Sequence, residues 1–124
     1  DGSVQIRSQS IDKDTSGTIL GRDELDVATE GESIQVKRLG TLMRELGVDR
    51  IDLLKMDIEG AEFGVIDDLL ASAVRPKQLL VEFHRYFTSG AQKERQAFAA
   101  LRKAGYQLFD ISPRDMEFGF LWPE

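Results

Sequence analysis

Four carboxylates and one imidazole are the side chains best suited to chemistry in this chain. Asp57, Glu59 and Glu62 lie within the run KMDIEGAE, and Glu82 and His84 lie together in a second apolar segment. Carboxylates can hold a cationic ligand, a metal ion or a proton, and a free imidazole titrates near neutrality. His84, the only histidine of the chain, could therefore accept the proton of a substrate hydroxyl group as a general base.

The segments that flank the first three carboxylates predict where they lie in the fold. An apolar run at 51–56 precedes them, and a segment with apolar residues at helical spacing follows them. The carboxylates are therefore expected where a buried strand turns into a helix. Open parallel sheets bind ligands just beyond the carboxyl ends of their strands, so this junction is the predicted functional edge of the sheet.

Each of these carboxylates also has a purely structural interpretation. Asp57 could cap the following helix, and Glu59 and Glu62, three residues apart, could lie on one side of its first turn and complement the helix dipole. Lys55 is unusual inside an apolar strand. We expect it to pair with one of these acids, because an unpaired buried ammonium group is costly.

Glu82 and His84 alternate with apolar residues, so both are expected on one face of their strand. His84 is then either a general base or a hydrogen-bonded structural histidine. Asp57, Glu59, Glu82 and His84 could in principle assemble a metal site. Nothing in their spacing requires a metal, and none is assigned from the sequence.

Composition excludes several classes of function. The chain has 124 residues, 41% of them hydrophobic and 31% charged, which is typical of one globular domain. A formal charge of −6 argues against nucleic acid and against an anionic membrane surface as partners. The chain has no cysteine, no apolar run of about 20 residues and no signal-peptide pattern. We expect a cytoplasmic protein.

Hydrophobic periodicity predicts three helices and a series of strands. The helices are expected at about 40–46, between 58 and Pro76, and between Ser89 and Gly105, with Gly47 as a C-cap and a capping box from Ser89 to Gln92. Residues 22–33 are expected to be irregular. Strands are predicted at 4–11, 33–37, 51–57, 78–84, 106–111 and 117–122.

Strands alternate with helices from residue 51 onward, which predicts an α/β fold with helices on both faces of the sheet. The near-continuous apolar run at 51–57 favours a strand covered on both sides. The link at 112–115 is too short for a parallel crossover, so the last two strands should be antiparallel within a mostly parallel sheet. We expect one domain over 1–124, with an irregular, edge-strand region at 1–38 and an α/β core at 39–124.

A rival signal lies near the start of the chain. Asp12, Asp14, Ser16, Thr18 and Asp23 fall at ligand positions of an EF-hand-like calcium loop. The preceding segment alternates like a strand instead of forming an entering helix, and the last position carries Asp where the motif has Glu. The segment is therefore either a calcium-binding module or a polar surface loop.

Together these motifs resemble the FkbM-type methyltransferase family. The resemblance rests on IDLLKMDIEGAE at 51–62, preceded by VKRLGTLMRELG at 36–47 and followed by LLVEFH at 79–84. It covers roughly residues 34–124, and Gly40 departs from the Thr or Asp that is usual there. The residues matching the family pattern D-x-x-K-x-D-x-E-G-x-E are Asp52, Lys55, Asp57, Glu59, Gly60 and Glu62.

The resemblance implies S-adenosylmethionine-dependent O-methylation of a sugar or natural-product hydroxyl. It implies a Rossmann-like sheet of seven strands, of which the core strands here would be the fourth to seventh, with an antiparallel last strand. Asp57, Glu59, Glu82 and His84 would be catalytic. Asp57 and Glu62 would bind the cofactor.

The resemblance is incomplete at the front, because no glycine-rich cofactor loop follows an apolar strand in this chain. The chain is therefore expected to be the C-terminal portion of a methyltransferase domain. A non-catalytic, methyltransferase-like interaction module is the alternative. The outer edge of the strand at 51–57 would be covered by the N-terminal strands or left bare, and a bare edge favours a homodimer.

Overall fold

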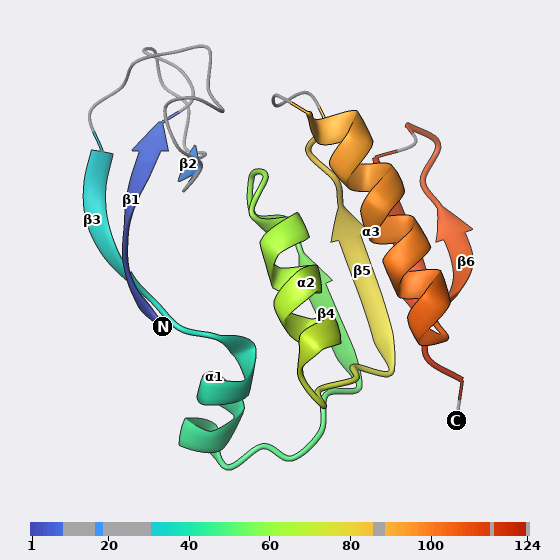
Figure 1. The fold of residues 1–124 in the computed structure, drawn as a ribbon, viewed down its shortest axis with the longest axis horizontal. Coiled ribbons are helices and arrows are strands. Elements are labelled where there is room, and N and C mark those ends of the chain that lie inside the picture. Colours follow the sequence, from blue (N-terminus) through green and yellow to red (C-terminus); the bar gives the residue numbers. More distant parts are fainter. Residues whose placement is uncertain (9–16, 19–30, 86–88, 115, 124) are drawn as a thin grey trace.

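Figure 1 shows the fold in a computed structural model, which describes residues 1–8, 17–18, 31–85, 89–114 and 116–123. No helix within these ranges combines the length and the apolar character that a bilayer crossing needs. The elements are, in chain order, β1 (Gly2–Ser8), β2 (Gly17–Thr18), β3 (Gly31–Val36), α1 (Leu39–Leu46), β4 (Leu53–Met56), α2 (Glu62–Ala71), β5 (Gln78–Glu82), α3 (Gly90–Ala104), β6 (Gln107–Ile111) and β7 (Glu117–Leu121).

The core of the fold is a four-stranded mixed sheet with the order β4-β5-β7-β6. β4 and β5 are parallel, and β7 is antiparallel to both of its neighbours. β4, β5 and β6 therefore run in one direction and β7 in the other. This arrangement confirms the predicted α/β fold, partial Rossmann-like sheet and antiparallel C-terminal strand.

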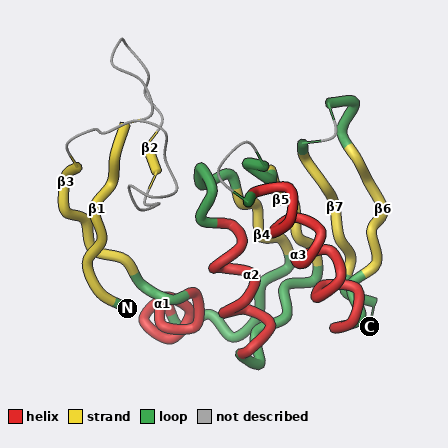
Figure 2. Tube along the Cα trace, turned by 45° about the horizontal axis from the view of Figure 1, so that its top comes forward, coloured by secondary structure: helices red, strands yellow, loops and turns green. Residues whose placement is uncertain are grey.

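The hydrophobic core lies between this sheet and two helices. Leu79 and Val81 of β5 are fully buried beneath Ile66 of α2 and Leu101 of α3. α2 and α3 lie side by side over the same face of the sheet, as Figures 1 and 2 show. Every second residue of β5 faces these helices, which explains the alternating burial along the strand.

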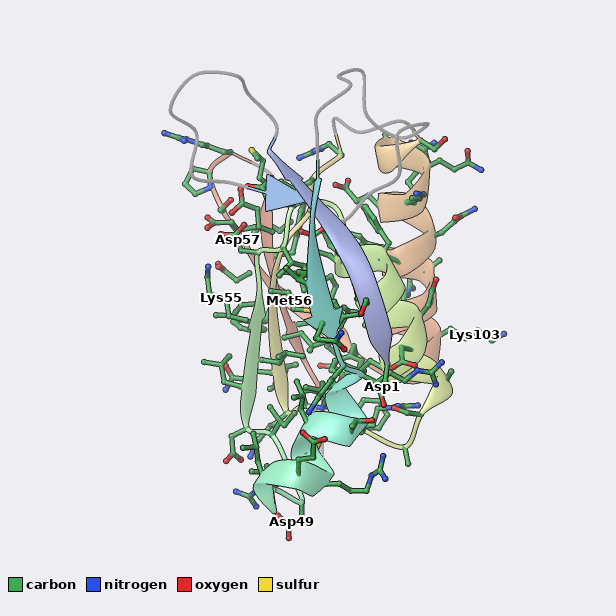
Figure 3. The ribbon with its side chains drawn as sticks, turned by 90° about the vertical axis from the view of Figure 1, so that its left-hand side faces the viewer. Asp1, Asp49, Lys55, Met56, Asp57 and Lys103 are labelled. Atoms are coloured by element: carbon green, nitrogen blue, oxygen red, sulfur yellow. The ribbon has the colours of Figure 1, made fainter. Side chains whose placement is uncertain are left out.

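The opposite face of the sheet is open in the described part of the chain. Leu53 is 54% exposed, the Lys55 side chain is 62% exposed, and Phe109 also faces solvent. Figure 3 shows Lys55 on the side of the sheet away from α2 and α3. The prediction that β4 is covered on both sides is therefore wrong. Helices on both faces are likewise not found, because α2 and α3 share one face and no described helix covers the other.

Residues 1–38, predicted to be irregular apart from edge strands, include a second sheet with the order β2-β1-β3. β1 pairs with β3 in an antiparallel register from Gly2↔Val36 to Arg7↔Gly31. β3 thus begins two residues before its predicted start. Among the described strands, β4 pairs only with β5, so the outer edge of β4 is bare, as one of the two predicted alternatives required.

The helix ends follow local chemistry. Gly47 and Gly105 both adopt the left-handed conformation, with φ of 66° and 109°, and end α1 and α3 as predicted. Ser89 precedes α3, but its side chain makes no capping hydrogen bond, so the predicted capping box is not formed. The reason is its φ of 62°, which differs from the extended backbone that a capping serine uses.

Candidate active site

The candidate site is built at the loop between β4 and α2. Asp57 follows the last residue of β4, and the chain then reverses through two consecutive positive-φ residues, Glu59 (54°) and Gly60 (97°). A left-handed conformation costs a non-glycine residue such as Glu59 roughly 1–2 kcal/mol. This reversal leaves Asp57 and Glu59 on the same side of the loop, where both approach the histidine that follows β5.

Glu62 is the structural centre of the site. Its side chain is completely buried, and its Oε1 accepts hydrogen bonds from the backbone N–H groups of Ile58 (3.0 Å) and Gly60 (3.2 Å). The same oxygen lies 2.7 Å from Nδ1 of His84. One carboxylate therefore fixes the loop and ties it to the segment after β5.

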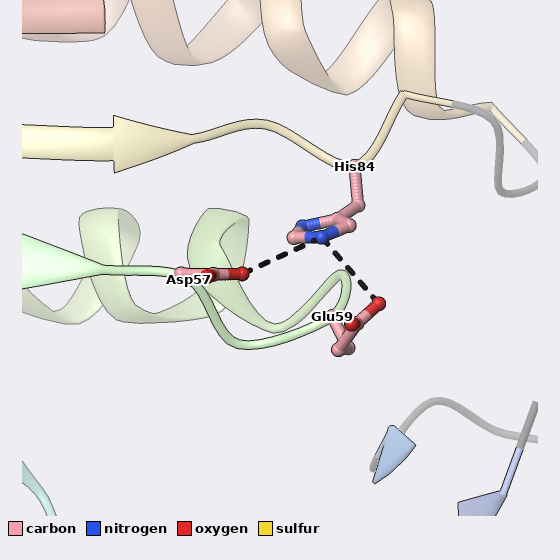
Figure 4. Close-up of side chains that lie close together, drawn as sticks. All are labelled: Asp57, Glu59 and His84. Carbon is pink, nitrogen blue, oxygen red and sulfur yellow. Dashed lines mark ion pairs between the residues drawn. The ribbon is translucent and has the colours of Figure 1, made fainter. Parts of the chain in front are cut away.

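The contact with Glu62 also sets the proton position on His84. An ionised carboxylate only accepts hydrogen bonds, so Nδ1 donates the proton and a neutral ring keeps its lone pair at Nε2. Nε2 lies 3.4 Å from Oε2 of Glu59 and 3.7 Å from Oδ1 of Asp57 (Figure 4). These separations exceed those of good hydrogen bonds but suit electrostatic stabilisation of a protonated ring.

The exposure of the four side chains falls in a gradient. Those of Glu62 and His84 are 0% and 4% exposed, whereas those of Glu59 and Asp57 are 21% and 43% exposed. A ligand from solvent therefore meets Asp57 and Glu59 first. The imidazole lies behind them on a buried carboxylate, and the combination can bind a cation or accept a proton.

Glu82 lies apart from this group. It faces the open side of the sheet, where it lines a cavity of about 180 Å³ with Lys55, Asp110 and Glu117. The prediction that Glu82 and His84 lie on one face of the same strand is wrong, because β5 ends at Glu82 and the chain then turns. The backbone N–H of Arg85 donates to the carbonyl of Phe83 in this turn (3.1 Å).

The structure agrees with only some of the structural interpretations of the carboxylates. Ala61, not Asp57, is the N-cap of α2, and Glu59 precedes the helix instead of lying in its first turn. Glu62 does lie in that first turn. Lys55 pairs with Asp57 at 3.7 Å as predicted, but the pair is exposed and contributes little to stability.

Two parts of the arrangement were not predicted from the sequence. The backbone N–H groups of Ile58 and Gly60 donate hydrogen bonds to Glu62, and Glu62 in turn contacts His84. Glu62 therefore positions the loop and the imidazole, and its own side chain does not reach solvent. The only local signal was the glycine of the E-G-x-E run, which permits the sharp reversal of the loop. The EF-hand-like segment at 12–23 lies outside the described residues except for Gly17–Thr18, which pair with β1.

Comparison with known proteins gives the family. Residues 3–108 match the methyltransferase FkbM domain, which covers most of the chain. The chain belongs to the FkbM methyltransferase family. The match begins inside β1 and ends in β6, so it includes the N-terminal sheet, whereas the resemblance was expected to begin near residue 34.

Two curated relatives support this assignment. The human "Probable methyltransferase-like protein 24" is 33% identical over 63 residues, which are 49% of this chain and 17% of the relative. The "AMB antimetabolite synthetase AmbE" of Pseudomonas aeruginosa is 40% identical over 58 residues, which are 44% of this chain and 3% of that protein. The matched segment is thus a small part of each relative. No solved structure matches the chain significantly.

Proposed function

We propose that this chain contributes to an S-adenosylmethionine-dependent O-methyltransferase that acts on a hydroxyl group of a sugar or another natural product. Membership of a methyltransferase family supports the reaction class. The observation that carries the choice of a hydroxyl acceptor is the orientation of His84. Its Nδ1 lies 2.7 Å from Glu62, so its Nε2 faces the carboxylates of Asp57 and Glu59 at the carboxyl edge of the sheet, where we propose that it acts as the base.

The residues present fit one part of a cofactor site. S-adenosylmethionine supplies an activated methyl group on a cationic sulfonium when bound. Asp57 offers a half-exposed carboxylate directly after β4, a position that suits a cationic ligand in open parallel sheets. Glu62 has no exposed surface with which to contact a ligand. It would support the cofactor site only by holding the loop at 58–60.

The acceptor hydroxyl must lose its proton as its oxygen becomes a nucleophile. His84 accepts that proton at Nε2 and becomes an imidazolium ion. Asp57 and Glu59 stabilise this ion from 3.7 and 3.4 Å, and Glu62 stabilises it from the Nδ1 side. General-base catalysis of this kind contributes roughly 10²–10⁴-fold in rate.

The charge of the site favours a neutral acceptor. Three carboxylates surround one imidazole, so an anionic substrate would be repelled, whereas a polyhydroxylated or other neutral molecule would not. The name of AmbE places one relative in the synthesis of an antimetabolite, which agrees with a natural-product acceptor.

The test is methyl transfer from labelled S-adenosylmethionine to a panel of sugars and hydroxylated natural products, using the protein at its full natural length. His84→Asn is the sharpest variant, because the Asn amide can still donate to Glu62 while the Nε2 base is lost. We expect transfer to neutral hydroxyls and a fall of at least 100-fold in His84→Asn. Glu45→Gln, in an exposed ion pair with Lys37, is the matched control.

Two outcomes would overturn this proposal. Equal methyl transfer by His84→Asn and wild type would exclude the histidine base. The absence of both cofactor binding and methyl transfer in the natural protein would favour the non-catalytic interaction module. Calorimetry of S-adenosylmethionine binding shows why a variant is inactive. A variant that has lost only the base should still bind the cofactor, whereas one that has lost the cofactor site should not.

A further inference from the structure

We propose that Asp57, Glu59 and His84 form a binding site for one divalent transition-metal ion of the Zn²⁺ class. One oxygen from each carboxylate and one imidazole nitrogen lie within 4.8 Å of one another. The three residues come from the loop after β4 and the segment after β5, so the site spans the two parallel strands (Figure 4). No other group of this kind occurs among the described residues.

The distances around Nε2 suit a tetrahedral ion. Nε2 lies 3.4 Å from Glu59 Oε2 and 3.7 Å from Asp57 Oδ1. With metal–ligand bonds of about 2.1 Å, these separations correspond to ligand–metal–ligand angles of roughly 110° and 120°. Both angles at the imidazole are near tetrahedral, and three protein ligands would leave a fourth position open, which is the pattern of catalytic rather than structural zinc sites.

The second ligand shell supports the assignment independently of the three ligands. Metal-bound histidines commonly donate their other ring N–H to a carboxylate, which fixes the tautomer and the ring orientation. His84 has this partner in Glu62, which is fully buried and anchored by two backbone N–H groups. The ring is therefore held with Nε2 directed at the two exposed carboxylates before any ion binds.

The charge balance also favours a cation. Glu62 has no exposed surface, and its Oε2 has no hydrogen-bond partner among the described residues. A buried carboxylate with one unsatisfied oxygen is costly unless nearby positive charge compensates it. Asp57 and Glu59 add two further carboxylates on the far side of the imidazole, and Lys55 lies 3.7 Å from Asp57, so the carboxylates still outnumber the cation. A divalent ion at Nε2 would offset this excess.

The identity of the ion follows from the donor set. One imidazole nitrogen with two carboxylate oxygens suits Zn²⁺, Co²⁺ or Mn²⁺, whereas Mg²⁺ and Ca²⁺ prefer oxygen ligands alone. If the proposed methyl transfer is correct, on which this role rests, the open position would bind the acceptor hydroxyl. The ion would then lower the pKa of that hydroxyl, whose proton would pass to water. In the metal-bound site Asp57, Glu59 and His84 would all be ligands, so His84 would no longer be the base.

The experiment is a titration of the purified chain with Co²⁺, a spectroscopic substitute for Zn²⁺ whose visible absorption is much stronger in four-coordinate than in six-coordinate sites. We expect these bands to saturate at one equivalent and to disappear when Zn²⁺ is added. Asp57→Asn and Glu59→Gln should each weaken Co²⁺ binding at least tenfold. Both side chains are partly exposed, so both variants should fold. Glu45→Gln should bind as wild type does.

Three results would overturn the site: no change in absorption, bands of a six-coordinate ion only, or equal binding by wild type, Asp57→Asn and Glu59→Gln. Equal binding would place the ion elsewhere, for instance on the acidic segment at 12–23. Circular dichroism of the metal-free variants checks that they are folded. Because the titration contains neither cofactor nor acceptor, its failure would leave the methyl-transfer proposal to be judged by its own assay.

Discussion

Nδ1 of His84 lies 2.7 Å from Oε1 of Glu62, and the two residues are 22 positions apart in sequence. Both side chains are buried, so this contact joins the loop after β4 to the segment after β5 inside the fold. The same oxygen accepts two backbone hydrogen bonds from the loop. The geometry of the site therefore depends on one carboxylate that a ligand from solvent cannot reach.

We predict that Glu62→Ala destabilises the protein by about 3–5 kcal/mol. The substitution leaves the N–H groups of Ile58 and Gly60 without their acceptor and removes the partner of His84. Glu62→Gln should cost less, because its amide oxygen can still accept. Urea unfolding measures the free energy of unfolding of both variants. Glu45→Ala, which removes an exposed ion pair, should change stability by less than about 1 kcal/mol, and an equal loss there would contradict the central role of Glu62.

Stability should fall at alkaline pH because of Tyr106. Burial raises the pKa of its hydroxyl to about 12, and Arg75 partly opposes this rise. The folded state therefore holds the proton more tightly than the unfolded chain, whose tyrosine pKa is 10.0. The stabilisation is complete below pH 10 and is lost as the pH rises from 10 towards 12.

Tyr106→Phe isolates this effect. At neutral pH the free energy of unfolding of the variant should be about 1 kcal/mol lower than that of the wild type. The reason is that the tyrosine O–H donates a hydrogen bond to the carbonyl of Pro76 at 2.8 Å. Between pH 10 and 12 the free energy of unfolding of the wild type should fall by an amount of the order of 2 kcal/mol, whereas that of the variant should not show this fall. Urea unfolding at pH 8, 10 and 11.5 should therefore show the advantage of the wild type shrinking and then reversing. A constant difference would mean that Tyr106 titrates normally.

Local features of the sequence were enough to predict most elements. Gly47 and Gly105 end their helices because only glycine adopts a positive φ without strain, and a strand such as β5 shows its period of two directly. Contacts between distant segments could not be predicted in this way. No local pattern links Glu62 to His84, and the turn after Glu82 that separates it from His84 depends on packing after β5.

The exposure of Leu53 shows a second limit of sequence reasoning. An apolar run predicts burial, but burial needs a second layer, and no described element covers this face of β4. Likewise Ser89 has the residue type of a helix cap, but its backbone conformation prevents the bond. A pattern thus indicates what a residue can do, whereas the neighbouring elements determine whether it does so.

Gly119 should be intolerant of a side chain. A Cβ atom at this position in β7 would lie 2.8 Å from Cζ of Phe109 on the neighbouring strand. The exposed Phe109 ring can move aside, whereas Cβ of Asp110, 3.1 Å away, is fixed by the backbone, so Gly119→Ala should destabilise the protein by about 1 kcal/mol. Gly64→Ala is the matched control, because nothing lies within 4 Å of its Cβ position in α2, and it should stabilise by roughly 0.5–1 kcal/mol. Thermal unfolding of the pair should show shifts of opposite sign.

We finally expect the chain to form a homodimer through β4. This strand pairs only with β5 among the described strands. The exposed side chain of Leu53 lies on the open face of the sheet. A bare edge with an apolar residue favours pairing with a second copy. Light scattering at increasing protein concentration should show a dimer, and Leu53→Glu should shift it at least tenfold towards monomer. Glu45→Gln should leave the dimer unchanged, whereas a wild type that stays monomeric at millimolar concentration would contradict this assembly.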